Sequence, residues 1–178
     1  MNQEIKDIIV KYGSHIICSE TFLGAFKQTH HYRTTVGDHT LGVTVEAVKF
    51  CLRHEITEDS TLANVVTSCL CHDLGILGRD RKFQNNMETL IQHPGHSAQA
   101  YMDVTGENNE RVLDAIRSHM FPLKLQMPKH KEGWILTLAD KISASMDVLR
   151  LPPVTAEERD ELLERAEKEM ESRKKETE

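Results

Sequence analysis

The sequence predicts an all-α protein that folds as a single domain, and three observations favour this fold class. Aliphatic residues are plentiful whereas aromatic residues make up only 5% of the 178 positions, a balance more typical of helices than of a sheet sandwich. Apolar residues recur at helical spacing along most of the chain. No segment alternates with a period of two for long enough to predict a strand.

The N-terminal part of the chain predicts a helical stretch, a loop and a second long helix. Residues 3–27 carry apolar groups at helical spacing, with a break near Gly13. Residues 29–40 are polar, so we expect a loop there. Asp38 is a residue type suited to cap the helix that we expect over residues 39–53.

The middle of the chain predicts three further helices. The first covers about 59–73, begins with cap-type residues and is stopped by Gly75. We expect a loop over 76–85, because this stretch is polar and lacks helical periodicity. Two more helices are predicted over 87–102 and 109–119, joined by a turn.

The C-terminal part predicts an ordered loop and two long helices. Two prolines fix the loop over 120–128. Residues 131–150 predict a strongly apolar helix, which the following pair of prolines ends. Thr155 and Glu158 have the spacing of a capping box and begin a charged C-terminal helix over 154–178.

Charge and cysteine content narrow the class of protein. The formal net charge of −6 argues against non-specific binding to duplex nucleic acid, which requires clustered Lys and Arg. The cysteines form no C-x-x-C pair and lie among apolar residues, as buried reduced thiols do; they are Cys18, Cys51, Cys69 and Cys71. The chain has neither a secretory signal pattern nor an apolar run approaching the ~20 residues that span a bilayer. We therefore expect a soluble cytoplasmic protein.

Six ionisable residues at helix ends or on apolar faces indicate a metal site. They are His39, His72, Asp73, His93, His119 and Asp140. Taken singly, each has an ordinary explanation: Asp140 can face solvent on a narrow polar strip, and the His72–Asp73 pair can be a satisfied helix end. Taken together, they are better explained by a bound cation, because buried carboxylates are costly without one. Imidazole nitrogens and carboxylate oxygens suit first-row divalent metals.

These residues, in this order, resemble the HD superfamily of metal-dependent phosphohydrolases. The stretches DHTLGV, LCHDLGI and LTLADKISA stand where that family has its first histidine, its His-Asp doublet and its final aspartate. HPGHSAQAY and AIRSHMFPL resemble the members with two further histidines, and EGWILTLADK resembles small bacterial HD hydrolases. The match implies one HD domain over 1–178, with a core of about 33–148 and a charged helix over 154–178.

The resemblance implies a ligand set for one or two divalent ions, for which Mn, Fe, Co, Ni, Zn and Mg all remain open. A first ion would be held by His39, His72, Asp73 and Asp140. A second would be bridged by Asp73 and completed by His93 and His119. Within HPGHS the alternative to His93 is His96; we favour His93 because its distance to the following Ser-Ala pair matches that in relatives.

Histidines outside this pattern are expected at the surface or in loops; they are His15, His30, His31, His54 and His130. Cys71 adjoins the doublet and is also a metal-ligand type, although a buried thiol is the simpler interpretation.

The implied activity is hydrolysis of a small phosphate ester, nucleotide-like, by metal-activated water. A divalent ion lowers the pKa of its bound water and polarises a phosphoryl oxygen, and Asp73 would orient that water. Cations are also needed for the phosphate; the candidates are Arg33, Arg79, Lys82, Arg117 and Lys141. Lys141 comes first because it adjoins a ligand, and Arg33 second because its segment resembles relatives. We expect neither duplex nucleic acid nor a membrane as partner, and the oligomeric state is open.

Two other functions fit the same residues. One is a catalytically silent regulatory module that binds metal or nucleotide, and the other is a di-iron oxygenase of the same superfamily. The doublet is followed by Leu74 and Gly75 rather than a Glu-Asp pair, which weakens the resemblance to guanosine tetraphosphate hydrolases. The absence of a Gly-Tyr-Pro segment after it weakens the resemblance to cyclic dinucleotide phosphodiesterases.

Overall fold

The architecture of the protein is helical, as the sequence predicts. The computed structural model describes residues 1–31, 34–149, 151 and 153–177, without the side chains of His31 and Thr177. Its elements are α1 (Gln3–Ile17), α2 (Glu20–Ala25), β1 (Thr29–His31), β2 (Thr34–Thr35), α3 (Val36–Arg53), α4 (Asp59–Cys71), a 3₁₀ turn η1 (Leu74–Ile76), α5 (Arg79–Lys82), α6 (Asn86–Thr105), α7 (Glu110–Ser118), α8 (Lys131–Leu149) and α9 (Ala156–Thr177).

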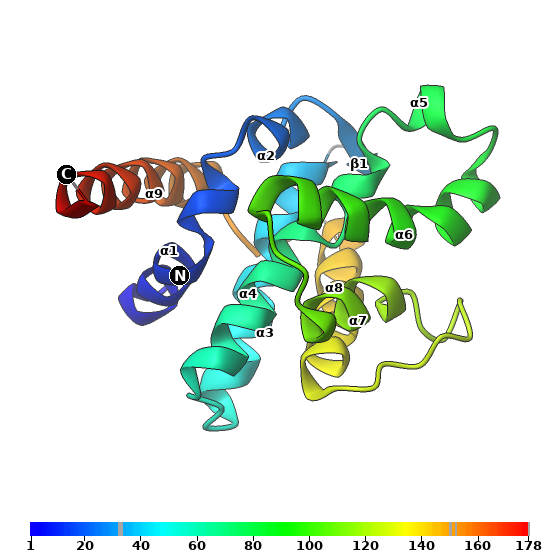
Figure 1. Cartoon of the computed structure of the whole chain (residues 1–178). Helices are drawn as coiled ribbons and strands as arrows, with labels where there is room; N and C mark the ends of the chain where they lie inside the picture. The colour runs from blue at the N-terminus through cyan, green and yellow to red at the C-terminus, as the bar shows by residue number, and fades with distance from the viewer. Residues whose placement is uncertain (32–33, 150, 152, 178) are drawn as a thin grey trace.

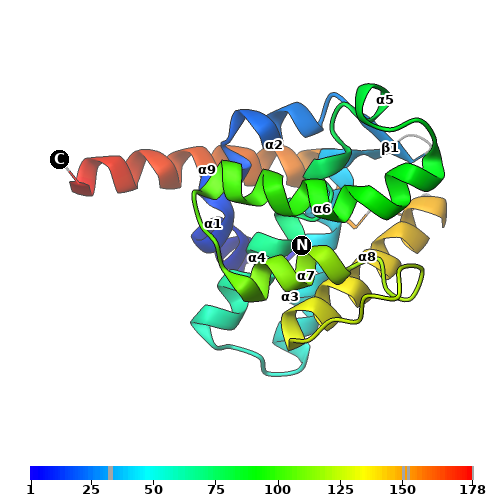
Figure 2. The ribbon, with the colours of Figure 1, turned by 45° about the vertical axis from the view of Figure 1, so that its right-hand side comes forward.

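Helices α3 and α4 form the centre of the arrangement. They pack against each other, α3 also packs against α8, and α4 also packs against α1 and α7. Figure 1 shows α1 and α9 on one side of these two helices and α7 and α8 on the other, while α6 crosses in front of them. Figure 2 shows α9 as a long rod whose C-terminal end projects beyond the other helices. Because α4 packs against several other helices, its C-terminal end is surrounded by other elements.

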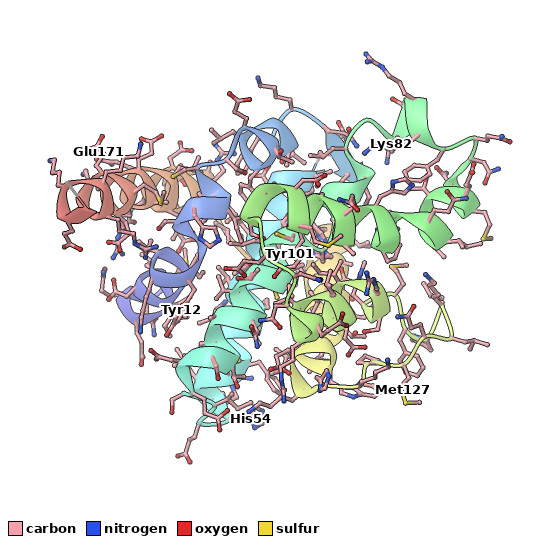
Figure 3. All side chains as sticks on the ribbon, viewed as in Figure 1. Tyr12, His54, Lys82, Tyr101, Met127 and Glu171 are labelled. Carbon is pink, nitrogen blue, oxygen red and sulfur yellow. The ribbon has the colours of Figure 1, made fainter. Side chains whose placement is uncertain are left out.

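The buried side chains form two clusters around this centre. The larger joins α1, α2, α3, α4, α6, α7 and α9, and the smaller lies between α3, α4, α7 and α8. Tyr101 of α6, labelled in Figure 3, is fully buried in the larger cluster. Each fully buried large apolar side chain stabilises the fold by roughly 1.5–3 kcal/mol relative to exposure. None of the helices within the described residues combines the length and apolar character of a membrane span.

Helix α9 follows the predicted capping box and buries a narrow apolar strip. The backbone N–H of Glu158 donates to Thr155 Oγ1 at 3.3 Å, and the Thr155 N–H donates to Glu158 Oε2 at 3.0 Å. Leu162 and Ala166 are fully buried in the same cluster as α1. The division of the chain into a core over 33–148 and an appended helix stays a prediction.

The break expected near Gly13 is wrong, because α1 continues through it to Ile17. A Cβ at Gly13 would lie 2.6 Å from Cδ1 of Leu70, so glycine here permits close packing of α1 on α4. The chain instead breaks where Ser19 caps α2, with the Phe22 N–H donating to Ser19 Oγ at 3.1 Å.

The loop expected over 29–40 is also wrong in part. Strands β1 and β2 pair as an antiparallel hairpin, with Thr29 opposite Thr35. Strands of this length are too short to show a sequence period. Helix α3 begins at Val36, and its cap is Thr35 rather than Asp38, whose N–H donates to Thr35 Oγ1 at 3.1 Å. The Asp38 carboxylate instead accepts a hydrogen bond from Arg159 at 3.1 Å.

Gly75 is not the helix stop that the sequence suggested. Helix α4 ends at Cys71, and Gly75 lies within η1. A Cβ at Gly75 would lie 2.3 Å from Ser97 N and 2.5 Å from His93 O, so only glycine lets η1 meet the backbone of α6. The Gly75 N–H also donates to Ser97 Oγ at 2.9 Å.

The remaining boundaries differ mostly by a few residues. Helix α6 is longer than predicted and is capped at its C-terminal end by Gly106, which adopts a left-handed conformation with φ of 70°. The loop expected over 76–85 contains the single turn of α5. Helix α8 is described as far as Leu149, so the predicted end at residue 150 lies outside the described residues.

Replacing Gly75 with alanine should destabilise the protein by about 1–3 kcal/mol, because the methyl group overlaps the backbone of α6. The measurement is the free energy of unfolding from urea titration. Gly95→Ala is the matched control, since a Cβ there meets nothing within 4 Å. The control should be neutral or stabilising by up to ~1 kcal/mol. Equal effects of the two changes would contradict the close contact between η1 and α6.

Candidate metal centre

The six candidate ligands come from separate parts of the chain and meet at the C-terminal end of α4. His39 lies near the start of α3, His93 in α6 and Asp140 in α8, whereas His72 and His119 follow the last residues of α4 and α7. All six are buried, with exposed fractions between 0% and 8%. So many ionisable side chains at such low exposure are costly unless they share a counter-charge.

The carboxylate of Asp73 lies at the centre of these residues. Its Oδ1 is 3.3 Å from His93 Nε2 and 3.6 Å from His119 Nε2. Its Oδ2 is 3.5 Å from His72 Nε2 and 4.0 Å from His39 Nε2. The two oxygens of one carboxylate thus face two different groups of imidazoles.

Asp140 belongs to one of these groups. Its Oδ1 is 3.2 Å from His39 Nε2 and 3.8 Å from His72 Nε2. We call His39, His72, Asp140 and Oδ2 of Asp73 site A. We call His93, His119 and Oδ1 of Asp73 site B.

Hydrogen bonds to the backbone fix the tautomer of three histidines. The Nδ1 atoms of His72, His93 and His119 lie 2.7, 2.8 and 2.7 Å from carbonyl oxygens. A carbonyl only accepts, so each Nδ1 carries the hydrogen, and in the neutral ring Nε2 presents a lone pair. His39 is oriented differently, by Oδ2 of Asp147 at 2.9 Å from its Nδ1. Such outer partners are typical of metal-binding histidines.

In the neutral rings, the inward nitrogens have no protons with which to pair with one another. His93 Nε2 and His119 Nε2 are 3.0 Å apart, so two neutral rings would oppose their lone pairs. His72 Nε2 is buried without a hydrogen-bond partner among the described residues. A cation turns these repulsive or unsatisfied lone pairs into bonds. There are also three groups of three buried His and Asp residues in which the donor atoms of each group lie within 4.8 Å of one another. The residues therefore fit a divalent metal.

The electrostatics keep the carboxylates ionised. Burial opposes ionisation of Asp73, but the charge of His72 and the hydrogen bond from His93 hold its pKa well below the usual range. The pKa of Asp140 is likewise lowered despite burial, by His39, His72 and Lys141. Ionised carboxylates are the form that metals bind.

The histidines divide between protonated and neutral forms. Burial, reinforced by the charges of His72 and His93, lowers the pKa of His119 to about 3. Burial opposes protonation of His39, but hydrogen bonds to Asp140 and Asp147 raise its pKa to about 10. A proton therefore occupies His39 when no metal competes for the site, and metal binding has to displace it.

A cavity of about 600 Å³ opens beside the cluster. His93, His119, Asp73 and Asp140 line one part of it, and apolar side chains line another. Of the candidate cations, Lys141 and Arg79 line the cavity. Lys141 Nζ donates to Asp140 Oδ2 at 2.7 Å and to the His119 carbonyl at 3.2 Å.

The other three candidate cations are not among the described residues that line the cavity. Lys82, labelled on α5 in Figure 3, donates to the Gly75 carbonyl at 3.5 Å and is absent from the cavity lining, as is Arg117. Arg33 lies outside the part of the chain that the structure describes. Its predicted role stays a prediction.

The expectation that His30 is a surface residue is wrong. His30 is 8% exposed, and its Nε2 lies 3.4 Å from Oδ2 of Asp73. The sequence carries no signal for this, because a hairpin of a few residues brings His30 to the site. Asp147 was also missed, although its position two helical turns after Asp140 places both on one face.

Between the two histidines of HPGHS, only His93 approaches Asp73. His96 is exposed, and its ring makes an edge-to-face contact with the ring of Phe83, with centroids 5.3 Å apart. His54, labelled in Figure 3, lies at the C-terminal end of α3, far from the hairpin. Cys71 is fully buried, and burial raises the pKa of its thiol.

Fold and site together define an all-helical protein with a buried cluster of donors suited to divalent metals. The HD domain model matches residues 36–145, and the chain belongs to the HD-domain family. This family consists mostly of metal-dependent hydrolases, and its domains bind divalent metals. Comparisons with curated proteins and with solved structures found no match.

Substitutions at site B should show whether the protein binds one metal ion or two. Protein purified without a chelator should contain more than one metal ion per chain by elemental analysis. His93→Ala and His119→Ala should each lose the second ion while keeping the first, because both nitrogens approach Oδ1 of Asp73, the oxygen assigned to site B. His96→Ala is the control and should keep the wild-type metal content. Loss of metal from the control instead would show that the wrong histidine of HPGHS has been chosen.

Proposed function

We propose that the protein is a metal-dependent phosphohydrolase that acts on a small phosphate ester. One observation carries the proposal: the Asp73 carboxylate, with imidazoles facing both of its oxygens, lies in the wall of a cavity that also contains two cations. A purely structural metal site would need neither a second group of histidines nor an adjoining cavity. The number of donors and their exposure to the cavity therefore favour an enzyme over a silent module.

The ligand roles follow from which oxygens and nitrogens face each other. His39, His72, Asp73 and Asp140 would hold a first divalent ion, and Asp73, His93 and His119 a second. An ion bound there supplies an activated water and polarises a phosphoryl oxygen. Asp73 lines the cavity, so its carboxylate would also accept a hydrogen bond from the attacking water and orient it toward phosphorus.

Lys141 would bind the phosphate of the substrate. Its side chain is 38% exposed, and its ammonium group is held beside Asp140 and the His119 carbonyl. A fixed ammonium group stabilises the negative charge that develops on the phosphoryl oxygens. Arg79 is the second cation in the cavity wall. Arg33 remains a third candidate, on the strength of its position in the sequence alone.

The apolar part of the cavity would bind the leaving group. It is formed by Ile76, Leu90, Met120, Leu123 and Ala144. A cavity of about 600 Å³ lies within the range of small-molecule sites, and it combines a charged end with an apolar wall. This combination favours a phosphate ester with an apolar or aromatic leaving group, such as a nucleotide.

A screen of nucleotides and aryl phosphates against several divalent metals tests the function. Wild-type protein should hydrolyse at least one ester, and Asp73→Ala should lose both metal and turnover while its far-UV circular dichroism is kept. Undiminished turnover by Asp73→Ala would refute the mechanism. Oxidation that depends on iron and dioxygen, with visible absorbance, would favour a di-iron oxygenase. Metal binding without any turnover would favour a regulatory module.

Lys141→Gln should lower kcat/KM for the best ester by about 10–100-fold, because a hydrogen bond from a charged donor contributes about 1.5–3 kcal/mol. Steady-state kinetics on metal-loaded protein measure this effect. Lys129→Gln, at an exposed position outside the cavity lining, is the matched control and should keep wild-type kinetics. An unchanged kcat/KM for Lys141→Gln would remove this residue from the site.

A further inference from the structure

We propose that His30 is an additional metal ligand, belonging to site A. It gives site A five protein donors, whereas site B has three. This inference rests on the metal centre of the proposed function but not on phosphate hydrolysis. It makes the two sites unequal: site A encloses its ion, and site B leaves coordination positions open toward the cavity.

The first support is the position of the His30 side chain. Its Nε2 is 3.4 Å from Oδ2 of Asp73, the oxygen that faces site A. Donor atoms of His30, His39 and Asp73 all lie within 4.8 Å of one another, and all three residues are buried. The His30 ring also lies against the ring of His39, with centroids 4.4 Å apart. His30 therefore approaches the same space as the ligands already assigned to site A.

The second support is the way in which the hairpin is held. Gln28 Nε2 donates to the Ile76 carbonyl at 2.8 Å, and the Gly78 N–H donates to Gln28 Oε1 at 2.6 Å. Arg79 Nη1 donates to the His30 carbonyl at 3.3 Å. These bonds tie β1 to the segment that follows Asp73, so the distance between His30 and Asp73 is fixed from both sides.

The third support is the difference in exposure between the two sites. Both histidines of site B, His93 and His119, line the cavity, whereas of the residues that belong to site A alone only Asp140 does. His30 lines the cavity and lies beside Oδ2 of Asp73, so its side chain borders both the cavity and site A. An imidazole there occupies a position that water would otherwise fill. With His30 as a ligand, site A would hold its ion more tightly, and the substrate would meet the ion in site B.

Cobalt titration of the full chain, stripped of metal, tests the assignment. His30→Gln should weaken the binding of the first Co²⁺ by at least about tenfold, since loss even of an outer partner costs 10–100-fold in affinity. The affinity for the second Co²⁺ should change much less. His96→Gln is the matched control, because it removes an exposed histidine that does not line the cavity. A chelator that absorbs visible light reports both affinities by competition.

Chemical rescue separates a ligand from a structural side chain. Free imidazole should restore the first Co²⁺ affinity of His30→Gly, because the space it leaves adjoins the cavity. Wild-type protein loaded with one Co²⁺ per chain provides a test that needs no variant. X-ray absorption should count three imidazoles around the ion, from His30, His39 and His72, rather than two.

The outcomes distinguish this inference from the proposed function. Unchanged first-ion affinity in His30→Gln, or two imidazoles around the first Co²⁺, would overturn it. Weaker binding of the phosphate ester with unchanged metal affinity would also overturn it, by showing that His30 contacts substrate instead. If the ligand count is three but no ester is hydrolysed, the assignment of His30 stands and the phosphohydrolase proposal fails.

Discussion

The arrangement of this protein depends on one buried carboxylate that several imidazoles share. Asp73 follows the end of α4, the helix that packs against α1, α3 and α7, and its two oxygens face different histidines. A buried carboxylate in such surroundings is stable only with positive charge nearby. The helices around α4 carry histidines whose inward nitrogens can hold a proton or a metal ion, and either would provide that charge. The core and the candidate metal site are therefore both built around the end of α4.

Helix ends provide the rigidity that this centre needs. His72 and His119 each follow the last residue of a helix, and their Nδ1 atoms bond carbonyls of the preceding turn. These carbonyls have no partner within the helix, so the histidines satisfy them and gain a fixed orientation in return. Gly75 contributes by allowing η1 to meet α6, the helix that carries His93. Ligand positions are therefore set by backbone hydrogen bonds and close packing rather than by flexible side chains.

Helical periodicity explains why the fold class and most helices were predictable, and motif order explains why the family was. His39, the doublet and Asp140 carry their signal within a few neighbouring residues. His30 and Asp147 do not: one is brought in by a hairpin too short to show a period, and the other is recognisable only as a second acid on the face of Asp140. Gly13 and Gly75 were misread as breaks because their contacts are with distant segments. These contacts join segments that are distant in the sequence, so no local sequence pattern reveals them.

The wide separation of the ligands along the chain has a consequence for folding. His39 and Asp140 are 101 positions apart, yet their side chains meet at 3.2 Å. An unfolded chain therefore has no preformed site. An ion bound at the site of the folded protein would act as a cross-link that closes a long loop. An ion that binds only the folded chain would raise the free energy of unfolding by RT ln(1 + c/Kd), where c is the ion concentration, so stability would grow with the logarithm of the ion concentration. The centre thus joins distant parts of the polypeptide much as a reversible covalent bridge would.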